Sequence, residues 1–128
     1  MNALPPSATD EDIFAFLDGW GRLLYADKYE EAFSFVDCFP MAGWTLNRLC
    51  GVLKYNEHKG RTQVIYISGG TKNKPQQKQL VRWKDSRTGY FGSIVYPLNL
   101  ISSQFTATFL LHLSEAGITL QLTDIYDG

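Results

Sequence analysis

The chain of 128 residues lacks any apolar run that approaches the roughly 20 residues needed to cross a bilayer. Its first six residues contain neither a basic start nor an apolar stretch, so they do not resemble a signal peptide. We therefore expect a cytoplasmic protein without a membrane segment. The length predicts a single domain over residues 1–128, of which residues 1–8 are expected to be flexible.

Cysteine and histidine are scarce, with two residues of each. The spacing between Cys38 and Cys50 matches no metal-binding pattern, and neither cysteine lies near a histidine that could complete a zinc site. We expect two reduced, partly buried thiols, because reducing compartments disfavour disulfides. No metal and no cofactor is predicted. His58 falls in a polar stretch and is expected to face solvent.

Basic residues are missing from residues 88–128 and concentrated in residues 54–87, which carry nine of them against two acids. This positive middle is typical of ordinary solvated loops, but it also suits docking onto an acidic protein partner. The candidate residues for such a partner are Lys72, Lys74, Lys78 and Arg82. Binding of nucleic acid is less favoured, because the whole protein has a net charge of −1.

Helical periodicity dominates the first half of the chain. Thr9 followed by three acids predicts a helix start, since the helix dipole favours acids in the first turn. Asp27, with Glu30 three residues later, suggests a capping box that opens a second helix, and Pro40 prevents its continuation. A third amphipathic helix is expected at about residues 45–55. The apolar face of the first helix contains Ile13, Phe16, Leu17, Trp20 and Leu24.

The apolar pattern changes to alternation in the second half, which predicts strands at residues 62–68, 79–83, 90–98, 104–114 and 118–126. Residues 71–77 are expected to form a polar loop and residues 84–89 a hairpin connection. Phe109 and Leu120 are predicted to face the helices, with His112 on the opposite face. The fold class is therefore α+β, with two or three amino-terminal helices packed on the concave face of a curved antiparallel sheet of four to five strands.

A first helix with Trp20, a helix pair around residues 27–36 and a terminal set of long strands resemble the nuclear transport factor 2-like (cystatin-like) cone fold. This resemblance implies a concave face that holds helices and a pocket, and an outer sheet face that forms a homodimer. In cone-fold isomerases and dehydratases, a pocket-facing aspartate acts as a general base.

Three stretches near the carboxyl end, residues 97–100, 104–109 and 118–126, are similar to the tail of small uncharacterised bacterial proteins. Some of those are suspected to be immunity proteins of toxin systems. This resemblance implies a protein partner and no catalytic residue.

Several side chains are candidates for a functional site. Asp124 shares the parity of Leu120, and if it faces inward, burial would give it the raised pKa of a general base. A β-bulge would instead turn Ile125 inward and leave Asp124 in solvent. The candidates for a pocket for a small apolar ligand, or for an interface, are Trp20, Tyr25, Trp44, Tyr66, Trp83, Tyr96 and His112.

These patterns predict a non-catalytic binding protein, of immunity type or an accessory domain, that acts through protein–protein contact. The alternative is a small-molecule-binding cone-fold protein, or an isomerase or lyase, with Asp124 as its general base.

Overall fold

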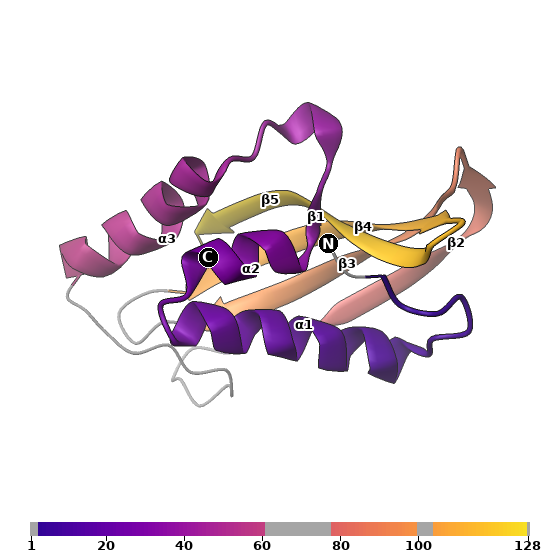
Figure 1. The fold of residues 1–128 in the computed structure, drawn as a ribbon, viewed down its shortest axis with the longest axis horizontal. Helices are drawn as coiled ribbons and strands as arrows, with labels where there is room; N and C mark the ends of the chain where they lie inside the picture. The colour runs from indigo at the N-terminus through magenta and orange to yellow at the C-terminus, as the bar shows by residue number, and fades with distance from the viewer. Residues whose placement is uncertain (1–2, 61–77, 100–103, 128) are drawn as a thin grey trace.

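Helices lie across one face of a sheet in the structure, a computed structural model that describes residues 3–60, 78–99 and 104–127 (Figure 1). The helices come first along the chain and the long strands follow, so the predicted α+β class is confirmed. The sheet has five strands in the order β1-β5-β4-β3-β2, and all neighbours are antiparallel except β1 and β5. In the described part of the chain, no helix is both long and apolar enough to cross a membrane.

Helix α1 (Asp10–Tyr25) begins at the predicted residue. The Thr9 hydroxyl accepts a hydrogen bond from the Asp12 backbone N–H, and the Asp12 carboxylate accepts one from the Thr9 N–H. This reciprocal capping box satisfies two backbone donors that the first helical turn leaves free. The acids of that turn also lie at the positive end of the helix dipole.

Two short helices lie between α1 and α3 along the chain. Helix α2 (Tyr29–Phe35) begins after Lys28, which makes no side-chain cap, so the predicted capping box at Asp27 is wrong. Asp27 has a φ of 65° and serves the tight turn between the helices instead. The 3-10 helix η1 (Pro40–Ala42) precedes α3 (Leu46–Gly60), whose first turn is capped by the Thr45 hydroxyl.

The four long strands are β2 (Gln79–Arg87), β3 (Tyr90–Asn99), β4 (Gln104–Ser114) and β5 (Gly117–Asp127). The predicted hairpin connection between these strands is confirmed, but its bounds of 84–89 are wrong, because β2 continues to Arg87 and only Thr88 and Gly89 form the turn. Both turn residues have positive φ, the geometry that two-residue hairpins favour. The strand predicted at 62–68 and the loop at 71–77 lie outside the described residues.

The core forms where α1 packs on the middle strands. Trp20 is fully buried, and its ring meets Phe109 of β4 edge-on at 5.2 Å and Tyr96 of β3 at 6.3 Å. Ile94, Phe109 and Leu120 are all buried, which confirms the predicted parity of the last two strands. Such aromatic contacts add to the burial of apolar surface that stabilises the fold.

The outer edge of β5 is covered by segments from the first half of the chain. Strand β1 (Asp37–Cys38) pairs with it in parallel, and Leu4 exchanges two backbone hydrogen bonds with Ile118. Further along, Leu122 accepts a hydrogen bond from the Phe39 N–H. Residues 1–8 were predicted to be flexible. The contacts of Leu4 attach part of this segment to the sheet. This edge of the sheet is therefore largely occupied.

Candidate functional site

Strand β2 forms the opposite edge of the sheet, and it is the least covered of the long strands. It pairs with β3 from Gln79 to Arg82 and again at Arg87, with an irregularity between. No other strand lies beside β2 within the parts of the chain that the structure describes. Val81 is 50% exposed and Trp83 is 39% exposed. An edge strand with exposed apolar side chains is a template for pairing with another chain.

The alternation along β2 places different side chains on its two faces. Leu80 is the register partner of the buried Ile94, so Leu80 and its neighbours in parity face α1. Val81 is the register partner of Ser93 and therefore lies on the outer face of the sheet. The edge thus has a polar side beside the helix and an apolar side away from it.

Two basic side chains tie the helix side of β2 to α1. The Lys78 ammonium lies 3.2 Å from the Asp18 carboxylate, and the Arg82 guanidinium lies 2.8 Å from that of Asp10. Two of the four candidates for an anionic partner are therefore ion-paired within the molecule, with their side chains still 37% and 44% exposed. The other two, Lys72 and Lys74, lie outside the described residues.

Asp18 also joins α1 to the buried part of the sheet. Its carboxylate accepts a hydrogen bond of 2.5 Å from the hydroxyl of Tyr96, which is fully buried. Burial raises the pKa of Tyr96, and the hydrogen bond to Asp18 raises it further. The Nε1 of Trp20 is buried without a hydrogen-bond partner among the described residues. Both Trp20 and Tyr96 are thus located in the core.

The other aromatic candidates are dispersed. Tyr25 is half-buried at the end of α1, and Tyr66 lies outside the described residues. Trp44 is buried, its Nε1 donates to the Thr123 carbonyl at 3.1 Å, and Arg48 lies 4.1 Å from its ring centre. Trp83 alone among the three tryptophans is exposed, and it belongs to β2.

His112 lies on the outer face of the sheet, as its parity predicts. It pairs with Tyr90 of β3, and their rings are 4.6 Å apart. The Tyr90 hydroxyl donates to Gln121 at 2.7 Å, and Phe39 contacts the Tyr90 ring from the segment after β1. Burial raises the pKa of Asp37 in β1, the register partner of Gln121, and nearby positive charge, including that of His112, opposes the rise. This group joins strands β1, β3, β4 and β5.

The inward placement of Asp124 is wrong. Thr108 is opposite Asp124 and Phe109 is opposite Leu122, so Thr123 is an extra residue that forms a β-bulge. The bulge turns Ile125 into the core and leaves Asp124 exposed, with its carboxylate on the Ile125 N–H at 2.9 Å. The burial that a general base would need is therefore absent at this residue, and the bulge alternative is confirmed.

The remaining chemistry-bearing groups form no compact centre. Cys38 and Cys50 are unpaired and half-buried, as predicted. Burial raises the pKa of the Cys38 thiol, and the charge of Asp37 raises it further, which makes the thiolate less available. Histidine, cysteine and acidic side chains form no group of three that could hold a metal ion among those the structure describes.

Comparison with known proteins leaves the family open. No protein-family model matches the chain, and no curated protein or solved structure matches it either. The likeness to the nuclear transport factor 2-like fold and to immunity-type tails therefore stays a prediction. The exposed edge strand β2 is the candidate site that the coordinates favour.

Proposed function

We propose that this protein is a non-catalytic binding protein that acts through protein–protein contact, and that the unpaired edge of β2 is its contact surface. The observation that carries the proposal is a nine-residue edge strand with Val81 half exposed and Trp83 more than one-third exposed. A partner segment in extended conformation can add to such an edge through backbone hydrogen bonds, while exposed side chains select its sequence.

Two features of the molecule support this edge as the surface. The opposite edge is partly occupied by β1 and by Leu4, whereas no strand among the described residues pairs with the outer edge of β2. Val81 and Trp83 expose apolar side chains on this edge, beside the charged Arg82 and Lys84. The tail resemblance to immunity-type proteins suggests toxin-like proteins as the first partners to test.

Capture of partners with the intact protein tests the proposal. The immobilised chain and the double variant Val81→Lys/Trp83→Lys are compared in lysate of the source cell. A captured protein is then identified, purified and titrated by calorimetry. We expect the double variant to weaken its binding at least about tenfold, since lysine on an edge strand opposes pairing. Amide hydrogen exchange of β2 is expected to slow in the complex.

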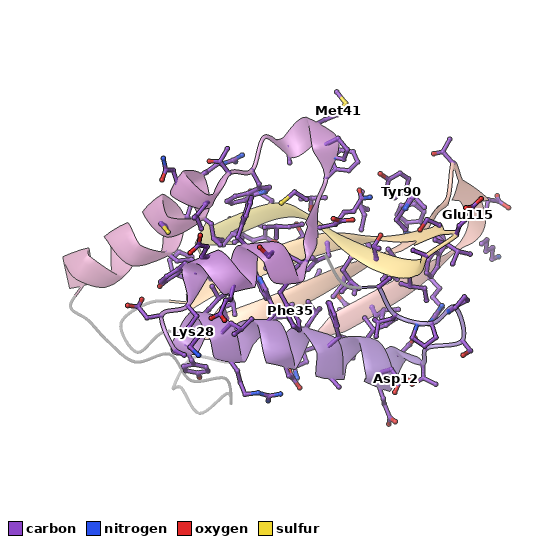
Figure 2. All side chains as sticks on the ribbon, viewed as in Figure 1. Asp12, Lys28, Phe35, Met41, Tyr90 and Glu115 are labelled. Carbon is purple, nitrogen blue, oxygen red and sulfur yellow. The ribbon has the colours of Figure 1, made fainter. Side chains whose placement is uncertain are left out.

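Met41→Lys provides the matched control. Met41 projects from η1 into solvent and is 85% exposed, so it offers an apolar side chain remote from β2 (Figure 2). If the double variant bound the partner as tightly as the wild type, and amide exchange of β2 were the same in the free protein and in the complex, the proposal would be contradicted.

A further inference from the structure

We propose that the segment that docks on β2 is an extended stretch of a partner protein in which acidic and apolar residues alternate. This inference rests on the proposed function and specifies the chemistry of the partner.

An added strand would present its side chains alternately to the two sides of the sheet. On the helix side, its residues would lie beside Lys78, Leu80 and Arg82, because Leu80 has the buried Ile94 as its register partner. On the other side, they would lie beside Val81, which has Ser93 as its partner. Two different neighbourhoods therefore alternate along one edge.

The helix side favours acidic residues. Arg82 donates from Nε and Nη2 to the same oxygen of Asp10, and no other described carboxylate pairs with its remaining guanidinium N–H groups, which could bind a second carboxylate. Among the described residues, the Lys78 ammonium pairs with one carboxylate, that of Asp18 at 3.2 Å, and it is also partly exposed. Carboxylates from a partner would extend both ion pairs into small networks.

Lys84 adds positive charge further along the same strand. Its side chain is exposed, and no ion pair reaches it from the described part of the protein. Between residues 78 and 87 the sequence has four basic residues and one acid. A basic segment would therefore be repelled here, since like charges on adjacent strands are destabilising.

The outer side favours apolar residues. Val81 on this side, and Trp83 in the irregular stretch that follows Arg82, expose apolar surface that a partner segment would remove from water. Val95 of β3 and Leu110 of β4, on the same outer face, are only half-buried. Apolar side chains at every second position of the partner segment would pack beside these residues and extend the apolar surface on the outer face of the sheet.

The same charges argue against a second copy of the chain on this edge. Antiparallel pairing of two β2 strands in the register that joins Val81 to Trp83 would place Arg82 opposite Arg82 of the other copy. Lys84 would meet the apolar Leu80. In this register, charge therefore favours an acidic partner over self-association.

Synthetic peptides provide the test with the full chain. Three labelled nine-residue peptides are compared by fluorescence anisotropy at concentrations where each is monomeric: valine alternating with glutamate, valine alternating with lysine, and the first composition with its valines grouped at one end. We expect the alternating glutamate peptide to bind about tenfold more tightly than either of the others. Its advantage over the lysine peptide should shrink in high salt.

Variants connect the binding to β2. Val81→Lys should weaken binding of the alternating glutamate peptide. Lys84→Glu should reduce the ratio between the affinities for the glutamate and lysine peptides. Met41→Lys should change neither the binding of the glutamate peptide nor this ratio. Because all three positions are exposed, circular dichroism is expected to show an unchanged fold.

Each of the other possible outcomes would overturn a specific part of the proposed partner chemistry. Equal binding of the two alternating peptides, lost in Val81→Lys, would overturn the acidic preference but leave β2 as a pairing edge. Equal binding of the grouped peptide would overturn the alternation. Absence of binding by all three would overturn the inference, while capture of a partner that depends on Val81 and Trp83 would still uphold the proposed function. A dimer in sedimentation that Val81→Lys dissociates would replace the partner segment with a second copy.

Discussion

Strands β4 and β2 belong to one sheet and differ in what surrounds them. β4 is paired on both sides, by β3 and β5, and Phe109 on its helix side is buried under Trp20. Within the described ranges, β2 is paired on one side only, and its outer residue Val81 is half exposed. β4 contains no charged residue whereas β2 contains four, so composition and position in the sheet both contribute to the difference. The middle of the sheet carries the buried core, and β2 carries the exposed apolar side chains.

The largest expected effect tests the stability side of this comparison. Phe109→Ala removes a ring packed against Trp20 and should lower the free energy of unfolding by about 4 kcal/mol, from lost burial and the remaining cavity. Urea unfolding followed by fluorescence measures it. Val81→Ala on β2 is the control, with an expected loss below about 1 kcal/mol. Equal losses would show that β2 is as well covered as β4.

A smaller effect concerns the link between the sheet and α1. Tyr96→Phe removes the hydrogen bond to Asp18 and should reduce the free energy of unfolding by about 1.5 kcal/mol at neutral pH. Because the pKa of Tyr96 is raised in the folded state, its contribution is complete below the pKa of an unfolded tyrosine, about 10, and is lost as the pH rises further.

The difference between the wild type and Tyr96→Phe should therefore shrink by about 1 kcal/mol between pH 9 and pH 11. Urea unfolding at both pH values provides the measurement. Tyr126→Phe is the control, since Tyr126 is exposed on β5 and its substitution should leave the pH dependence unchanged. A constant difference across this range would contradict the role of the Tyr96 proton.

The smallest effect is expected where β2 meets α1. Arg82→Gln removes an ion pair with Asp10 whose side chains are both about half exposed, so the free energy of unfolding should fall by less than about 1 kcal/mol. A double-mutant cycle with Asp10→Asn measures the coupling, which should weaken in high salt. Coupling above about 2 kcal/mol would mean that this pair holds β2 in place and would remove Arg82 from the binding surface.

Local patterns predicted the fold class and much of its detail. The Thr9 cap and the alternation of residues 104–114 depend on neighbours in sequence, and both match the structure. The hairpin turn at Thr88 was predicted, but residues 84–87 before it were assigned to the connection because they are polar, although β2 continues through them. Aspartate is a residue type that commonly caps helices, but Asp27 has the positive φ of a turn residue.

The candidate site was only partly predictable, because it depends on contacts between distant segments. One extra residue at Thr123 reverses the parity beyond it, and because no sequence period reveals such a bulge, the sequence left Asp124 open between an inward and an exposed position. The ion pairs of Lys78 and Arg82 join residues 60 and 72 positions apart. Trp83 was among the predicted interface residues, but its place on the free edge required the strand order.

The backbone contacts that Leu4, Asp37 and Phe39 make along β5 have a consequence for stoichiometry. A sheet open at both borders can recruit one strand after another and grow into a filament. Here the chain itself occupies the β5 border at Ile118, Gln121 and Leu122, which blocks strand addition along that stretch and leaves β2 as the longer border for addition. Assemblies built on this border should stop at a single bound segment per molecule rather than polymerise.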